Sequence, residues 1–228
     1  MKAHLINCSD CKHCFFSRYC SVDWTARIND HKNQLEYRKG QYIYYQGSPI
    51  FGIFIVASGK VKIISTGTGK KDQIMRIAVD GHVLGRWGTD DEVYATSGIA
   101  LEDSVICFVH NDLLRNACLI NTQLSFELMR FYALELKKAQ YRIKILSQYS
   151  VKEKVAETLL YLSEVFGTEY YNQIPSCINQ HDIASFAGTA PEQVSRNLSW
   201  LRREDIIRNE ERKITIVNRP RLLELAHI

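Results

Sequence analysis

The hydrophobic pattern of the chain changes sharply near Asn111, and this change limits the folds that the sequence can adopt. Before it, short β-branched or aromatic runs alternate with glycine-containing turns, which is typical of strands in a small antiparallel barrel or sandwich. These runs are residues 42–45, 52–56, 60–64, 74–78 and 105–109. After Asn111, apolar residues recur at helical spacing. The sequence therefore predicts an α+β protein with a β domain followed by helices.

Length and composition limit the class of protein further. A chain of 228 residues is long enough for one large domain or two modest ones. Its apolar runs are strand-sized, far shorter than the roughly 20 residues of a membrane span. The first twenty residues contain no apolar stretch of the kind found in signal peptides. We therefore expect a cytoplasmic protein without a membrane partner.

A heptad pattern follows the predicted β domain. Apolar residues recur at steps of three and four without an intervening proline or glycine, and one small barrel cannot cover so long a stripe. A helix packed on its own barrel is the alternative, but the pattern favours a dimer. The predicted dimer interface consists of Met129, Tyr132, Leu136, Ala139, Ile143 and Leu146.

The last third of the chain carries the signals of a winged helix-turn-helix. A short helix over His181–Ala187 ends at Gly188, and Pro191 begins a second helix that runs to about Arg203. Residues 206–208 and 214–217 then predict a two-stranded wing. The alternative is an ordinary helical hairpin with a charged, solvated face. The wing and the upstream dimer helix favour DNA binding, because DNA half-sites require a dimer.

The second helix presents side chains suited to reading DNA. Arg can bond guanine, Glu can accept from cytosine, and Ser can address several bases. This polar face carries Glu192, Ser195, Arg196, Ser199 and Arg203, while Arg202, Arg212 and Lys213 are placed to meet phosphates. From residue 150 onward ten Lys and Arg oppose eleven Asp and Glu, so this prediction rests on local arrangement and not on bulk charge.

Four of the seven cysteines lie within the first twenty residues. Three have the spacing Cys11-x2-Cys14-x5-Cys20, and Cys8 precedes them. Twenty residues cannot build a core, so thiols this dense indicate a metal site, an iron–sulfur cluster or a redox switch. Structural disulfides are rare in the cytosol, and an odd number of cysteines argues against a paired framework.

Together these features resemble the Crp/Fnr family of transcription regulators. The resemblance runs from Cys11 to Leu225 and includes the roll motifs Lys39-Gly40, Gln46-Gly47, Ser58-Gly59-Lys60-Val61 and Gly81-x3-Gly85. It implies a Cys-rich arm with a short helix over 1–34 and a cyclic-nucleotide-binding-like, antiparallel β-roll sensor over 35–120. It also implies a long dimerisation helix over 121–149 and a winged helix-turn-helix over 150–228. The sequence shows no nucleophile–base motif, carboxylate pair or phosphate loop, so we do not expect an enzyme.

The second helix is similar to that of the Fnr branch in its Glu-x-x-Ser-Arg pattern, residues 192–196. This resemblance implies a homodimer that binds a TTGA-type palindrome in double-stranded DNA and contacts RNA polymerase. Arg196 would meet the guanine, Glu192 the opposing cytosine and Ser195 a thymine.

The resemblance also bears on the effector. Cyclic-nucleotide binders hold the ligand with Gly-Glu and, shortly afterwards, Arg-Ser or Arg-Thr. Here these positions read Gly85-Arg86-Trp87-Gly88 and Tyr94-Ala95-Thr96, so we do not expect cyclic AMP.

The Fnr branch instead holds a [4Fe–4S] cluster on three arm cysteines and one central cysteine, and it senses oxygen or nitric oxide. The resemblance implies Cys11, Cys14, Cys20 and Cys107 as ligands. Cys8 is an alternative ligand, since Cys8-x2-Cys11-x2-Cys14 is also possible. A zinc site with Cys20 or a thiol–disulfide switch remains open, and Cys118 and Cys177 are expected to pack as apolar residues.

Overall fold

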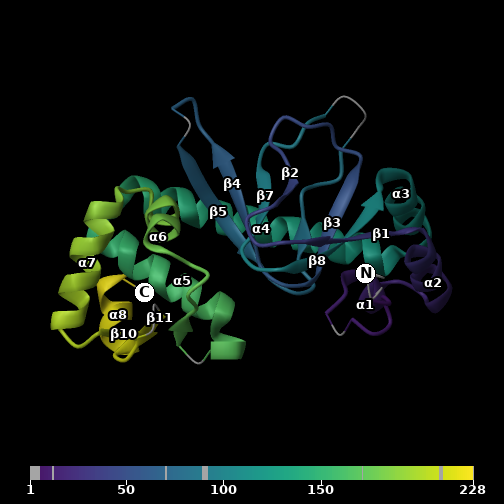
Figure 1. Cartoon of the computed structure of the whole chain (residues 1–228). Helices are drawn as coiled ribbons and strands as arrows, with labels where there is room; N and C mark the ends of the chain where they lie inside the picture. Colours follow the sequence, from purple (N-terminus) through teal and green to yellow (C-terminus); the bar gives the residue numbers. More distant parts are fainter. Residues whose placement is uncertain are drawn as a thin grey trace. The chain divides into compact units, whose positions relative to one another are not determined.

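The computed structural model describes residues 6–11, 13–69, 71–88, 92–170, 172–210 and 213–227, with backbone alone for residues 167–170. The chain divides into two compact units. The first comprises residues 1–71 and 75–136, and the second comprises residues 72–74 and 137–228. Figure 1 shows strands in the first unit and mainly helices in the second.

The first unit is built on two four-stranded antiparallel sheets, with strand orders β1-β8-β3-β6 and β2-β7-β4-β5. All five strands expected from the sequence form, and β1, β6 and β7 are additional. The strands are β1 (Asn33–Tyr37), β2 (Tyr42–Tyr44), β3 (Gly52–Ser58), β4 (Val61–Thr66), β5 (Asp72–Ala78), β6 (Val83–Leu84), β7 (Ser97–Ala100) and β8 (Ser104–His110).

Strand β3 is apolar along its whole length because both of its faces are covered. Successive side chains of a strand point to opposite faces. Ile53 and Ile55 therefore enter one apolar cluster, while Val56 enters another inside the roll. The first cluster is the one that matters for the cysteines, since it joins β3 and β8 to the N-terminal arm and to four helices.

Those four helices are α1 (Phe15–Tyr19), α2 (Val22–His31), α3 (Asn111–Ile120) and α4 (Thr122–Gln148). Leu124 and Leu128 of α4 pack in the same cluster as the arm. At about 1.5 Å per residue, the 27 residues of α4 extend roughly 40 Å.

An exposed apolar stripe runs along α4. Met129, Leu136 and Ile143 are 63%, 61% and 66% exposed, and Phe126 continues the stripe by one step. Ala139 is exposed as well. The other two residues of the predicted seam are partly buried: Tyr132 packs in the first unit's cluster, and Leu146 is half-covered.

The second unit contains the predicted winged helix-turn-helix. Its three-stranded sheet has the order β10-β11-β9, and β10 pairs antiparallel with β11 as the wing. Strand β9 and helix α8 were not predicted from the sequence. The elements are α5 (Val151–Tyr170), β9 (Gln173–Ile174), α6 (Gln180–Ala187), α7 (Pro191–Arg203), β10 (Ile207–Glu210), β11 (Lys213–Ile216) and α8 (Arg219–Leu225).

A buried arginine joins the end of α4 to two helices of the second unit. Arg142 Nη1 lies 3.2 Å from Glu157 Oε2 on α5, and both side chains are almost fully buried. The guanidinium also lies over the Phe186 ring at 3.8 Å and donates to the Phe186 carbonyl oxygen. Burial raises the pKa of Glu157 and lowers that of Arg142, while their mutual attraction opposes both shifts.

No helix in the part of the chain that the structure describes is both long and apolar enough to span a membrane.

Candidate nucleic-acid interface and cysteine site

Helix α7 buries one face and exposes the other. Val194, Leu198 and Leu201 are buried, as the apolar spacing predicts. On the opposite face the predicted DNA-reading residues Glu192, Ser195, Arg196 and Arg203 are exposed, and Arg202, predicted to meet phosphate, is exposed as well. The arrangement therefore presents both cationic and acidic side chains on one accessible helix surface.

Two of the predicted DNA contacts are partly buried, and a third lies outside the described residues. Ser199 is partly buried, and its hydroxyl accepts a hydrogen bond of 2.9 Å from Arg202 Nη2. Lys213 begins β11 in the wing and is partly buried. The third is Arg212.

Local signals place α7 relative to α6. Asn179 and Asp182 form a reciprocal capping box at the start of α6. Gly188 ends that helix with φ 60°, a left-handed conformation that favours glycine. Pro191 then occupies the first turn of α7, where its missing N–H costs nothing. The turn between the two helices is thus encoded residue by residue.

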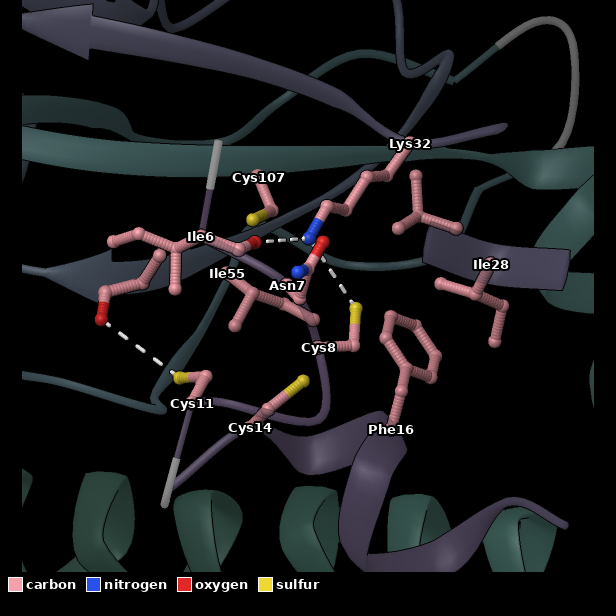
Figure 2. A pocket seen from close by; sticks show the side chains of 12 residues that line it. Ile6, Asn7, Cys8, Cys11, Cys14, Phe16, Ile28, Lys32, Ile55 and Cys107 are labelled. Carbon is pink, nitrogen blue, oxygen red and sulfur yellow. Dashed lines mark hydrogen bonds between the residues drawn. The ribbon is translucent and has the colours of Figure 1, made fainter. Parts of the chain in front are cut away.

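Four cysteine side chains line one small cavity. Cys8, Cys11 and Cys14 come from the arm, and Cys107 comes from β8 (Figure 2). Two backbone turns bring the arm thiols together, with Cys11 N–H bonded to the Asn7 carbonyl at 3.2 Å and Cys14 N–H to the Cys11 carbonyl at 3.0 Å. Cys8, Cys14 and Cys107 are buried.

The arm is tied to α2 and β1 by side chains. Cys8 N–H donates to Asn29 Oδ1 at 3.1 Å, and Ile6 N–H donates to Gln34 Oε1 at 2.8 Å. Lys32 Nζ donates to the Ile6 carbonyl at 2.6 Å and to Cys8 Sγ at 3.4 Å. Sequence reasoning missed Asn29, Lys32 and Gln34, because isolated polar residues near a helix end and on a half-exposed strand carry no distinctive signal.

The cysteine thiols differ in their electrostatics. A hydrogen bond from the Cys8 thiol lowers the pKa of Cys14 to about 6, and the same contact raises the pKa of Cys8. Burial raises the pKa of Cys107, although the hydrogen bond from Gln34 opposes this. One negative charge in the cavity is therefore best placed on Cys14, with Cys8 as its donor.

Cys20 lies outside the set of residues that line the cavity. It caps the C-terminal end of α1, whereas Cys14 caps the N-terminal end. Burial raises the pKa of Cys20 to about 12, and the nearby Cys118 and Cys14 thiols add to the shift. The structure thus brings three of the four predicted ligands together, adds Cys8, and sets Cys20 beside Cys118.

The donor set of this cavity fits an iron–sulfur cluster or a zinc ion, both of which bind cysteine thiolates. In the described residues, no three His, Cys, Asp or Glu side chains already stand in metal-binding geometry. The cavity volume is about 10 Å³, which is room for roughly one water molecule. A larger group requires the lining of the cavity to rearrange. The arm is held both by the hydrogen bonds described above and by the burial of Cys8 and Cys14 in the apolar cluster.

In the part of the roll where cyclic-nucleotide binders hold their ligand, the side chains of this chain bind one another. Arg86 forms an exposed ion pair with Glu92 at 3.2 Å. Tyr94 is buried, donates to the Gly52 carbonyl at 2.7 Å and packs on Tyr44 with ring centroids 4.6 Å apart. Aromatic side chains therefore fill this part of the roll's interior.

Two sequence families match the chain. Residues 34–121 match the cyclic nucleotide-binding domain, and residues 153–225 match the Crp-like helix-turn-helix domain. The chain is 26% identical to the transcriptional activator protein FnrA of Stutzerimonas stutzeri over 224 residues, covering 95% of this chain and 92% of that protein. It is 27% identical to the anaerobic regulatory protein of Bacillus subtilis over 177 residues, covering 76% and 74%. The solved structure of FixK2 from Bradyrhizobium japonicum has a TM-score of 0.76 at 26% identity, covering 85% of this chain and 96% of that one.

Proposed function

The chain belongs to the Crp/Fnr family of DNA-binding transcription regulators, and we propose that it senses oxygen or nitric oxide through a [4Fe–4S] cluster at the cysteine site. The observation that carries this proposal is the cavity in which three arm thiols meet a thiol of β8. The relatives named as anaerobic regulatory proteins support an oxygen-linked signal.

Three ligands are common to every version of the proposal: Cys11, Cys14 and Cys107. The fourth place has two candidates. The C-x2-C-x5-C spacing favours Cys20, and the cavity favours Cys8. Cysteines of the arm and of β8 would hold such a cluster by metal–sulfur bonds, and the cluster would supply the group that reacts with oxygen or nitric oxide.

Packing contacts connect the arm to α4, so a movement of the cysteines would change the packing of α4. Cys14 immediately precedes α1, whose Phe15 packs edge-on against Phe131 of α4 with ring centroids 6.2 Å apart. Tyr132 of α4 lies in the same apolar cluster and accepts the Trp87 N–H at 3.3 Å. Movement of the arm thus alters the packing of α4 at the level of its exposed stripe.

The stripe of Phe126, Met129, Leu136 and Ile143 is the proposed dimer interface with a second copy of the chain. It is apolar, exposed and repeats at heptad spacing, as coiled-coil seams do. A dimer places two recognition helices on DNA half-sites about 34–36 Å apart. A change in how the α4 helices meet therefore changes the fit to a TTGA-type palindrome, and RNA polymerase is the expected partner at the promoter.

Anaerobic purification followed by iron, zinc and acid-labile sulfide analysis tests the sensor. We expect about four iron and four sulfide per chain, as the formula of the cluster requires. Stoichiometric zinc without sulfide would overturn the cluster and favour the zinc alternative. A protein with neither metal nor sulfide would instead favour a thiol switch.

A further inference from the structure

Two side chains, one at the end of α2 and one in β1, each contact both the arm and a cysteine sulfur. Lys32 donates to the Ile6 carbonyl at 2.6 Å and to Cys8 Sγ at 3.4 Å. Gln34 accepts from Ile6 N–H at 2.8 Å and donates to Cys107 Sγ at 3.2 Å. We call this pair, Lys32 and Gln34, the clasp. Figure 2 shows Lys32 with its bonds to Ile6 and Cys8 above the arm cysteines.

Strand register explains why Gln34 reaches Cys107. The two residues are direct partners in the antiparallel pairing of β1 with β8. Directly opposed residues have Cβ atoms about 4.5–5.5 Å apart on one face of the sheet, so an amide side chain can span the gap. Because the same amide also accepts the Ile6 N–H, one side chain links the arm to the central cysteine.

The position of Lys32 is explained by its partners. It caps the C-terminal end of α2, where a cation is favourable. Its ammonium is partly buried beside sulfur atoms, one of which belongs to Cys8, the hydrogen-bond partner of Cys14. A cation at this place compensates negative charge in the thiol cavity.

From these contacts we propose that Lys32 and Gln34 are positioning residues of the cysteine site, which dock the arm and stabilise negative charge on its sulfurs. The inference rests on the proposed cluster for its second part, while the docking of the arm stands without it. Donors to a sulfur favour its more negative form, so the clasp raises the reduction potential of a bound cluster. It also slows the departure of the arm, and with it the loss of iron.

The two roles of Gln34 can be separated by substitution. Gln34→Glu keeps an oxygen acceptor for Ile6 N–H, but it removes the donor to Cys107 and to the Ile6 carbonyl, which lies 3.4 Å from Gln34 Nε2, and it adds a negative charge. Gln34→Leu removes all three bonds. Lys32→Met removes the cation, and Lys32→Arg is the conservative rescue. Glu36→Gln, at an exposed position of the same strand, is the matched control.

Three measurements on the full chain test the clasp. Hydrogen exchange of the segment 6–14 in metal-free protein reports arm docking. It should quicken most in Gln34→Leu and Lys32→Met and less in Gln34→Glu, which keeps the acceptor for Ile6 N–H. The midpoint potential of the anaerobic cluster should fall in Gln34→Glu and Lys32→Met and recover in Lys32→Arg. Iron removal by a chelator should quicken in Gln34→Leu, because loss of a side chain that supports metal ligands weakens metal binding by roughly 10-fold or more.

The outcomes separate this inference from the proposed function. If the wild type carries a cluster but the Gln34 and Lys32 variants match Glu36→Gln in potential and chelation rate, the clasp is refuted and the sensor stands. If the wild type carries no iron and sulfide, the sensor is refuted. Hydrogen exchange then decides the docking role by itself, and unchanged exchange in Gln34→Leu overturns it.

Discussion

The recognition helix and the cysteine site are held in place by different means. Helix α7 is fixed by a buried apolar face, a glycine stop and a proline start, all within one stretch of chain. The cysteine site joins an N-terminal arm to β8 across a cavity of about 10 Å³, and both an apolar cluster and polar side chains hold the arm. The proposed DNA-reading surface is thus preformed, whereas the cysteine site includes contacts that chemistry at sulfur can change.

The largest expected effect concerns the cysteine site alone. Alanine at Cys11, Cys14 or Cys107 should abolish the binding of iron and sulfide. Of Cys8→Ala and Cys20→Ala, only one should do so, because a cluster takes four protein thiolates. Iron and sulfide analysis after anaerobic purification measures this. Loss in both variants, or in neither, would contradict a four-thiol site built from this set.

Cys177 supplies a matched control, since it lies in the second unit and outside the cavity. Cys177→Ala should keep its iron and sulfide. The circular dichroism of every variant should retain the helical signal, because the second unit does not use the arm thiols.

The next largest effect concerns the buried ion pair between Arg142 and Glu157 in the second unit. Arg142→Met leaves Glu157 as a buried, unpaired carboxylate and should lower the free energy of unfolding by about 3–5 kcal/mol. Urea unfolding followed by circular dichroism measures this. Arg221→Met, on α8, removes an exposed pair with Glu224 and should change stability far less. Equal losses in the two variants would refute a structural role for the buried pair.

The same contrast between the two regions explains what the sequence could predict. Helices α6 and α7 and the wing were predicted because their signals, Gly188 and Pro191 among them, are local. Strand β9 was missed because it has two residues, and β1 because it is half-exposed and polar. A short strand that forms because of its neighbours has few residues, so its own sequence carries little of the periodicity that predicts a strand.

The candidate site was predicted only in part, for a related reason. Cysteine spacing pointed to Cys11 and Cys14, and the family resemblance added Cys107, but the place of Cys8 depends on a turn and on Lys32, which are tertiary features. Likewise, the heptad spacing of α4 does not distinguish residues that face a partner from those that face the chain's own units. Tyr132 and Leu146 fit the spacing yet are partly buried in the single chain.

Substitutions in the proposed DNA interface should have intermediate effects on DNA affinity. Some should also change the choice of base, and others should change only the salt dependence. Arg196→Ala should weaken binding to a TTGA-type site by about 1–3 kcal/mol and relax the choice of base at the guanine. Lys213→Ala should weaken binding evenly across sequences and reduce the salt slope by about one. Binding isotherms on matched and base-substituted duplexes at several salt concentrations distinguish the two. Unchanged base discrimination in Arg196→Ala would remove it as the guanine reader.

The smallest effect tests how closely the arm lies on the roll. Gly81 has φ 80°, and a Cβ there would meet the backbone and side chain of His13 in the arm. Gly47 has φ 85° with open space around it, and both glycines donate their N–H to a neighbouring carbonyl. Alanine at either site therefore carries a similar backbone strain of about 1–2 kcal/mol.

Only Gly81→Ala adds a clash with the arm, so the difference between the two variants measures arm docking. We expect Gly81→Ala to lose about 1 kcal/mol more than Gly47→Ala, at the lower end of overpacking costs, because the arm can shift outward. Its segment 6–14 should also exchange hydrogen faster, whereas Gly47→Ala should leave that segment unchanged. Equal stability and exchange would mean that the arm does not rest on Gly81. Movement of the cysteines would then have to reach α4 through Phe15 without support from the roll.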